Sequence, residues 1–399
     1  MRWATATALL GIASGVAFGP ATPAGAGPPD TSWTADLRHG DAAGVVVDDG
    51  VARIDPRTAF VAAAEDAPPD ATARPTGLLT FPVHRLPTAT DHVAVAVDGE
   101  VPAGATATVD VRGRRSTGGW TEWIPAADGP DGRIVALPAP STQVQARLVL
   151  AGDPAAGPAV RGVSLTARPA PPGRAESDER ADALSYRVFA TREGLVGGKT
   201  ANGHVIGDRD HFVALPSRRA LSPRGSSDYS VKVCARGRCA FAPVWDVGPW
   251  NTRDDYWNPS SKRQEWRDLP QGVPQAQAAH DDGYNGGRDQ YGRKVSNPAG
   301  IDLGDGFFWD ALGLKNNSWV DVEYLWTGAE RLTVVAADTD LRAAPDGAAE
   351  VVGVAAGHAA VPVQCARDGW LRVGTDQYVE AAAVPDAPHV GACPLQAAP

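Results

Sequence analysis

The sequence predicts an all-β protein of several domains. Its 399 residues are more than one ordinary hydrophobic core organises, so two or three domains are expected. Over residues 32–167, short runs of alternating apolar residues are separated by turn residues, and no helical periodicity stands out. These observations favour β-sheet domains, beginning with a β-sandwich.

The N-terminus has the pattern of a secretory signal peptide over residues 1–26. Arg2 precedes an apolar run from about Trp3 to Phe18, and Ala24-Gly25-Ala26 supplies small residues for cleavage. This run is too short to span a bilayer, and no later segment has the roughly 18 uninterrupted apolar residues that spanning requires. We therefore expect a secreted, extracellular protein without a membrane anchor.

The net charge and the cysteine content further restrict the partners and the cellular compartment that the sequence predicts. A formal net charge of -10 argues against a nucleic-acid partner, because binding phosphates requires a concentrated basic surface. No cofactor is expected. Four cysteines in an exported chain predict two disulfides, and the most local of the three pairings joins Cys234 to Cys239 and Cys365 to Cys393. The expected Cα separations are about 4.4–6.8 Å.

The first domain is followed by a linker. The stretch Gly118-Gly119-Trp120-Thr121-Glu122-Trp123 resembles part of the jelly-roll accessory modules of secreted bacterial hydrolases. The alternative, that Trp120 and Trp123 are packing residues, is favoured because large aromatics mostly serve burial. Residues 168–182 combine a proline-rich run with a dense run of charges, which predicts an exposed linker.

Two aspartate motifs mark the central region, residues 183–328. In Val244-Trp245-Asp246-Val247-Gly248-Pro249-Trp250 and in Gly300-Ile301-Asp302-Leu303, an aspartate lies in or just after an apolar strand-like run. With Thr200-Ala201-Asn202-Gly203 upstream, this order resembles the double-psi β-barrel family of rare lipoprotein A, the expansins and related lytic transglycosylases. The resemblance spans residues 186–326 and implies a double-psi β-barrel.

The resemblance also implies roles for particular residues. Asp302 matches the acid that protonates the glycosidic oxygen, Asp246 matches a residue that orients substrate or stabilises positive charge, and Thr191 aligns loosely with an expansin threonine. His204 stands where rare lipoprotein A has a glutamate, so it is a candidate acid-base group or simply an exposed turn histidine. Each aspartate could instead cap a loop by accepting backbone N–H bonds. If both serve the site, their carboxyls should lie within roughly 10 Å of each other.

Aromatic residues predict a carbohydrate groove in this region. Seven of the twelve tryptophans fall between Trp245 and Trp326, and Trp250, Tyr256 and Trp257 are candidates to bind substrate. About half of the seven should be core instead. The long insertion at residues 251–297 is interpreted as an aromatic lid, with a calcium-binding loop as the alternative; no metal ligand is assigned.

Residues 331–394 resemble the bacterial SH3-like domain, through Leu341-Arg342, Val351-Val352-Gly353, Gly369-Trp370 and Tyr378-Val379. The departure at Ala343-Ala344-Pro345 leaves peptide binding open. Together the resemblances imply a protein associated with the cell wall that binds or remodels its glycan, with peptidoglycan as partner. Two alternatives remain: a lytic transglycosylase or glycan hydrolase using Asp302, and an exported hydrolase of another class. The sequence predicts no oligomeric state.

Overall fold

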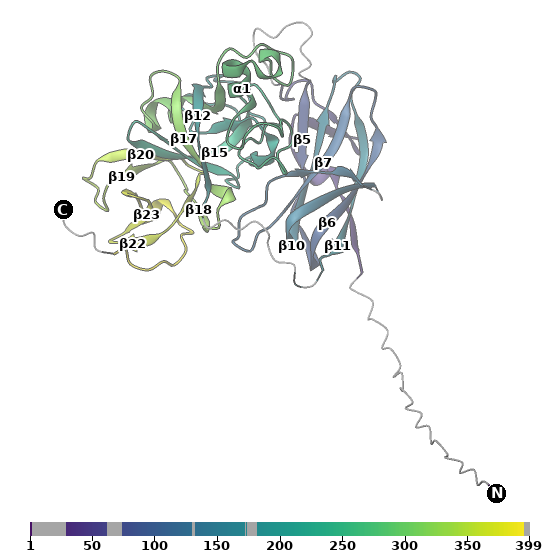
Figure 1. Cartoon of the computed structure of the whole chain (residues 1–399), viewed down its shortest axis with the longest axis horizontal. Helices are drawn as coiled ribbons and strands as arrows, with labels where there is room; N and C mark the ends of the chain where they lie inside the picture. The colour runs from purple at the N-terminus through teal and green to yellow at the C-terminus, as the bar shows by residue number, and fades with distance from the viewer. Residues whose placement is uncertain (2–28, 62–73, 130–131, 172, 174–181, 395–399) are drawn as a thin grey trace.

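The structure is a computed structural model that describes residues 1, 29–61, 74–129, 132–171, 173 and 182–394. With 47% of the chain in strands and 9% in helices, the all-β prediction is confirmed. The N-terminal sandwich and the C-terminal domain lie on opposite sides of a central barrel (Figure 1). The predicted signal peptide beyond Met1, and linker residues 172 and 174–181, fall outside the described residues.

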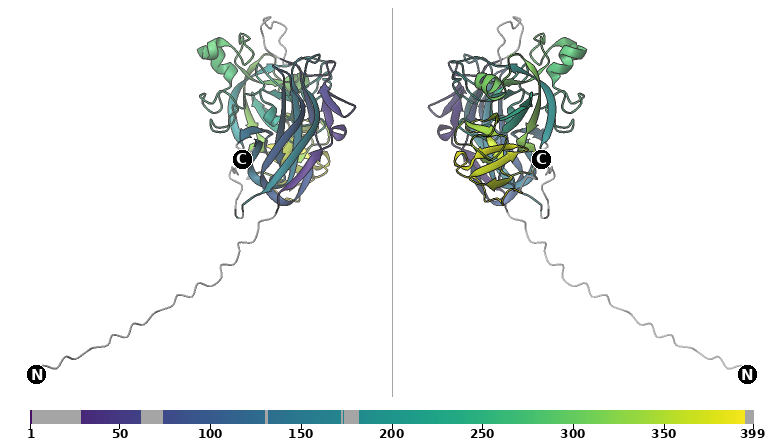
Figure 2. Two further views of the ribbon diagram at one scale, coloured as in Figure 1. Left: turned by 90° about the vertical axis from the view of Figure 1, so that its right-hand side faces the viewer. Right: turned by 90° about the vertical axis from the view of Figure 1, so that its left-hand side faces the viewer.

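The N-terminal part is an antiparallel β-sandwich whose strands face the viewer in the left panel of Figure 2. Its longest strand, β10, pairs with β6 through its first half and lies between β5 and β7 through its second half. Side chains along each strand point alternately into the core and away from it. In β6, Val93 and Val95 are buried, whereas Ala94 and Ala96 are more exposed. The strands are β1 (Thr31–Ala35), β2 (Asp41–Ala43), β3 (Val45–Asp48), β4 (Val51–Ile54), β5 (Thr76–Thr80), β6 (His84–Glu100), β7 (Thr106–Gly113), β8 (Ile124–Pro125), β9 (Ala127–Gly129), β10 (Gly132–Ala151) and β11 (Ala159–Pro169).

The central part is a closed six-stranded barrel. Its strands are β12 (Leu184–Arg192), β13 (Val213–Leu215), β14 (Ser230–Ala235), β15 (Arg238–Val247), β16 (Ala299–Leu303) and β17 (Ser318–Tyr324). Around the ring the order is β13, β16, β12, β17, β14, β15 and back to β13. The pairs β12–β16 and β13–β15 are parallel, and the other neighbours are antiparallel.

The hairpin between β14 and β15 carries the first disulfide. Arg236 and Gly237 both have positive φ, 52° and 80°, which gives the two-residue turn that suits the twist of a hairpin. The Cys234–Cys239 disulfide forms one register step from this turn, with Cα atoms 4.1 Å apart. This separation is just below the expected range because the step next to a two-residue turn is a close, non-hydrogen-bonded pair.

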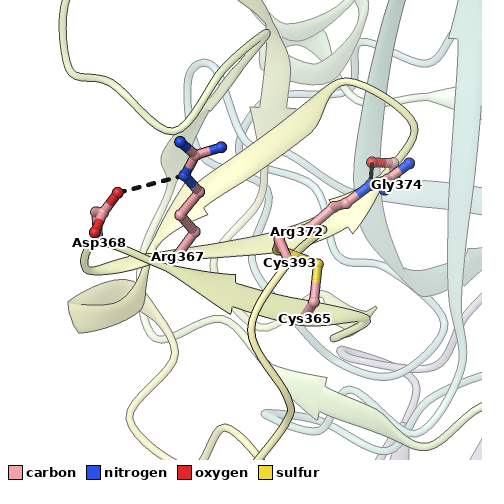
Figure 3. Close-up of a disulfide and its surroundings, with 6 residues drawn as sticks. All are labelled: Cys365, Arg367, Asp368, Arg372, Gly374 and Cys393. Carbon is pink, nitrogen blue, oxygen red and sulfur yellow. Dashed lines mark hydrogen bonds and ion pairs between the residues drawn. A yellow bond between two sulfur atoms is a disulfide. The ribbon is translucent and has the colours of Figure 1, made fainter. Parts of the chain in front are cut away.

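The C-terminal part is a small β domain closed by the second predicted disulfide. Cys365 and Cys393 are bonded with Cα atoms 4.9 Å apart, and Figure 3 shows the bond beside Arg372. Strand β20 extends the barrel's sheet by pairing with β15. The strands are β18 (Leu332–Val334), β19 (Thr339–Arg342), β20 (Val351–Ala355), β21 (Ala360–Pro362), β22 (Cys365–Arg367), β23 (Trp370–Gly374) and β24 (Gln377–Glu380).

Helical structure is confined to short segments. The single α-helix among the described residues is α1 (Gln275–Asp282), within the insertion. The remaining turns are η1 (Leu37–His39), η2 (Arg218–Ala220), η3 (Tyr284–Gly287), η4 (Phe307–Ala311), η5 (Leu325–Thr327) and η6 (Ala381–Ala383). No helix in the described part of the chain is long and apolar enough to cross a membrane. The two disulfides suit an oxidising, extracellular-type environment.

The sandwich has its own hydrophobic core, but two of its tryptophans pack into the core of the barrel. Trp120 and Trp123 are 5% and 0% exposed and belong to the cluster of buried residues that fills the barrel, so the packing interpretation of these tryptophans is confirmed. Between them, Glu122 accepts hydrogen bonds from Nε1 of Trp257 at 2.6 Å and Nε1 of Trp326 at 3.1 Å. The sandwich is therefore built into the barrel's core and is not merely tethered to it.

Candidate functional site

Strand pairing brings the two predicted aspartates to one face of the barrel. Asp302 of β16 and Asp246 of β15 both pair with Ala214 of β13, one from each side. Paired residues point to the same face and strands lie about 4.8 Å apart, so the two aspartate backbones are separated by about 10 Å. A Cβ added to Gly248 would lie 3.4 Å from Oδ2 of Asp302, so that carboxyl reaches the turn that follows Asp246.

Each parallel pair changes register just before its aspartate. Between β13 and β15 the extra residue is Trp245, and between β12 and β16 it is Gly300. Such bulges increase the local twist and redirect side chains, and they are common beside active sites. Glycine is required at position 300 because an added Cβ would lie 2.5 Å from Cγ of Pro274 in the insertion.

Thr191 holds Asp302 rather than lining a free surface. It pairs with Asp302 across β12 and β16, it is 8% exposed, and its hydroxyl donates a hydrogen bond to Oδ1 of Asp302. The structure therefore gives Thr191 a place beside the candidate acid, in agreement with the loose alignment, although its contact is with the protein.

Glu193 is a site residue that the sequence analysis missed. It follows the end of β12, its backbone N–H donates to the carbonyl of Leu303 at 2.9 Å, and its carboxyl interacts with that of Asp246. Its Oε2 is buried and has no hydrogen-bond partner among the described residues. The signal was the period-two alternation of a strand, which puts Glu193 on the same face as Thr191.

The pKa values of all three carboxyls are raised. Burial, reinforced by the charge of Asp246, raises the pKa of Asp302 to about 7 even though the Thr191 hydroxyl favours its ionised form. Burial raises the pKa of Glu193 well above its usual range, and the negative charges of Asp246 and Asp302 raise it further. Burial also raises the pKa of Asp246, but there the contact with Glu193 and two backbone N–H groups oppose it.

These contacts separate the roles of the carboxyls. Oδ1 of Asp246 accepts the N–H of Ala201 and of Val247, both at 2.7 Å, so Asp246 caps a turn as well as facing the site. Asp302 accepts only the Thr191 hydroxyl within the described structure, and it is partly exposed. The arrangement favours an ionised Asp246, a protonated Glu193 and an Asp302 that changes charge near neutral pH.

His204 lies in another part of the barrel. Its Nε2 contacts Oδ2 of Asp210 at 2.7 Å, and its ring centroid is 4.6 Å from that of Trp245. It lines a cavity of about 420 Å³, together with His211 and His358, where the barrel meets the C-terminal domain. No contact between described residues links His204 to the three carboxyls.

Two of the predicted sugar-binding aromatics are core residues. Tyr256 and Trp257 are both 0% exposed, and the hydroxyl of Tyr256 bonds with that of Tyr324 at 2.7 Å. A sugar ring has no surface on either residue to stack against in this structure, which corrects the prediction for both. Trp250 stays partly exposed just after the Gly248-Pro249 turn, where its Nε1 donates to Asn297 at 3.1 Å.

The insertion is held by buried ion pairs. Arg263 and Asp254 pair with both side chains fully buried, and Oδ2 of Asp254 also accepts the N–H of Gln275 at 2.6 Å, which fixes the start of α1. Arg293 and Asp289 form a second pair at 2.5 Å. Within the described residues, no group of three or more His, Cys, Asp or Glu side chains is placed to hold a metal ion.

Comparison with known proteins adds one match. A protein family described as "Domain of unknown function (DUF8814)" matches residues 184–323. This range begins at the first residue of β12 and ends one residue before the end of β17, so it is the six-stranded barrel with its insertion. No curated protein and no solved structure matches the chain.

Proposed function

We propose that the barrel cleaves a glycosidic bond, with Asp302 as the general acid, and that its substrate is the glycan of the cell wall, most specifically peptidoglycan. The observation that carries this proposal is the position of Asp302, which shares one barrel face with Asp246 and accepts the Thr191 hydroxyl; its burial there raises its pKa to about 7. A general acid must carry its proton at the working pH, and an ordinary aspartate does not.

The chemistry divides between the carboxyls on this face. Protonated Asp302 gives its proton to the glycosidic oxygen as the bond between that oxygen and the anomeric carbon breaks. The ionised carboxylate of Asp246 stabilises the positive charge that develops on the sugar ring. Water, or a hydroxyl of the same sugar, then bonds to the anomeric carbon, and its proton goes to the carboxylate of Asp302.

Glu193 allows two neighbouring carboxyls to be in different protonation states. Two adjacent buried carboxyls do not both ionise readily, so a proton retained on Glu193 lets Asp246 carry the negative charge. Ala214 lies between the two aspartates on β13 and adds only a methyl group to this face. Thr191 orients Asp302 through its hydroxyl.

Export to the wall is part of the same proposal. The secretory pattern of residues 1–26, the two disulfides and the resemblances to rare lipoprotein A and to bacterial SH3-like domains support it. The closed barrel with two parallel strand pairs supports the first resemblance, and the small C-terminal β domain supports the second.

The test incubates the mature full-length protein with purified peptidoglycan and measures soluble muropeptides. Wild type should release them, and Asp302→Asn should lower the rate at least 100-fold, because asparagine keeps the shape but cannot donate a carboxylic proton. The matched control is Asp310→Asn, an exposed aspartate paired with Arg209, which should behave as wild type. Equal release by wild type and Asp302→Asn would falsify the assignment.

A second candidate, wall binding without cleavage, is favoured by the two N–H bonds to Asp246, since these give that carboxyl a purely structural use. In that case wild type should sediment with peptidoglycan but release nothing. Trp250→Ala should then weaken sedimentation, because Trp250 is the predicted sugar-binding aromatic that keeps an exposed edge.

A further inference from the structure

A polar strand face of the sandwich is turned toward the barrel. On β7, the alternation buries Ala107, Val109 and Val111 in the sandwich core and turns Thr106, Thr108 and Asp110 the other way. Across the pair with β10, Asp110 faces Arg147 and the two threonines face Ala151 and Val149. Because both strands lie in a regular sheet, this face is a rigid floor.

Segments of the central domain form the other walls of a cavity above this floor. Arg218 and Arg219 come from the turn η2, and Thr252, Arg253 and Tyr291 come from the insertion. With the floor they enclose a cavity of about 380 Å³ between the two domains. This volume is within the usual range of small-molecule sites, roughly 300–1,000 Å³.

The cavity has more positive charge than the described residues neutralise. Five arginines line it, Arg74, Arg147, Arg218, Arg219 and Arg253, against one carboxylate, Asp110. Arg147 pairs with Asp110 at 2.8 Å. Arg219 pairs with Asp255 at 2.8 Å and Arg253 with Glu265 at 2.5 Å. Arg74 and Arg218 have no carboxylate partner within 4.0 Å in the described part of the chain.

Arg218 is a partly buried cation with no carboxylate in direct contact among the described residues. Its guanidinium contacts hydroxyls only, Oγ1 of Thr76 at 3.4 Å and the hydroxyl of Tyr291. Burial is the main cause that lowers its pKa; Tyr291 and the negative charge of Asp110 oppose this, and the positive charge of Arg253 adds to it. Arginine stays charged in proteins, so this site retains a partly buried cation that an anion would stabilise.

We propose that this cavity binds an oxyanion group, phosphate or carboxylate, on a hydroxyl-bearing molecule, with Arg218 and Arg74 as the main cationic contacts. The planar fork of arginine fits the paired oxygens of either group, and the threonine and tyrosine hydroxyls suit the remainder of such a molecule. The site is separate from Asp302 and does not depend on the proposed cleavage. A ligand there contacts both domains, so it should stabilise the full-length protein.

The test measures thermal unfolding of the full-length protein at constant ionic strength. Glycerol 3-phosphate probes the phosphate group and glucuronate the carboxylate group, with sodium chloride held at matched ionic strength. At least one probe should raise the unfolding temperature saturably, and the one that does identifies the group. If neither probe exceeds chloride, the proposal is overturned.

Variants locate the binding. Arg218→Gln should weaken the apparent affinity about tenfold or more, the usual cost of losing a charge-assisted contact. Arg74→Gln should weaken it as well, and because Arg74 is exposed this variant keeps the test valid if Arg218→Gln does not fold. The control is Arg161→Gln, a half-exposed arginine paired with Glu100 elsewhere on the sandwich. Wild-type affinity in both cavity variants would place the binding elsewhere.

Discussion

Replacing Asp302 by asparagine should stabilise the protein at neutral and alkaline pH but not in acid. The folded state raises the pKa of this carboxyl from the ordinary 3.8 to about 7. Between these values the unfolded chain ionises Asp302 while the folded protein keeps it protonated, so the free energy of unfolding falls as pH rises. Asparagine does not titrate, so the variant escapes this loss.

The size of the effect follows from the same pKa values. A rise from 3.8 to about 7 corresponds to about 4 kcal/mol at most. Asp302 is partly exposed, so water reduces the penalty, and we expect a gain of about 2 kcal/mol. The difference between variant and wild type should be small at pH 4, just above the ordinary pKa of 3.8, grow through pH 5 and 6, and level off above about pH 7.

The assay is urea unfolding of the full-length protein followed by tryptophan fluorescence, at a series of pH values from 4 to 8.5. Asp310→Asn is the matched control, since this exposed aspartate should give no such trend. A difference between Asp302→Asn and wild type that does not change with pH would refute the raised pKa. The general-acid proposal would lose its main support as well.

Three further predictions concern the neighbours of the site and the domain contacts. Thr191→Val removes a hydrogen bond to the ionised form of Asp302, so the alkaline limit of muropeptide release should move up by about one pH unit in a pH–rate profile. Glu122→Ala leaves buried tryptophan donors without an acceptor and should cost about 3 kcal/mol in urea unfolding. Replacing Cys365 and Cys393 by serine opens a disulfide between residues 28 positions apart and should cost about 3 kcal/mol, measured by thermal unfolding.

Much of the fold could be predicted because its signals are local. The alternation of His92-Val93-Ala94-Val95 gave a strand in which buried and exposed positions take turns, and the structure has it in β6. The cysteine spacing gave both disulfides; Cys234 and Cys239, for example, lie one residue pair outside a two-residue turn. These features depend on neighbours in the chain, so the sequence contains the information needed to predict them.

The site was harder to predict because it depends on long-range pairing. Asp246 and Asp302 meet only because β13 pairs with both of their strands, and that expectation came from the family resemblance rather than from spacing. Glu193 was not predicted because the family resemblance assigns a role to Thr191 but none to Glu193, although period-two alternation places both on one face. Trp257 was assigned to the surface because its hydrogen-bond acceptor, Glu122, lies 135 residues earlier in another domain.

The packing of Trp120 and Trp123 into the core of the barrel decides which form of the protein an experiment should use. A barrel cut out at residue 183 would expose Trp257 and Trp326, whose indole N–H groups bond to Glu122 and which the sandwich covers. It would also lose the contact between the hydroxyl of Tyr229 and the carbonyl of Thr121, at 2.6 Å. The two indole N–H groups and the tyrosine hydroxyl would then lose their protein acceptors. They would lie beside aromatic surface that is newly exposed to water. Inactivity of an isolated barrel would therefore reflect its folding, and only the full-length protein can report on the chemistry of Asp302.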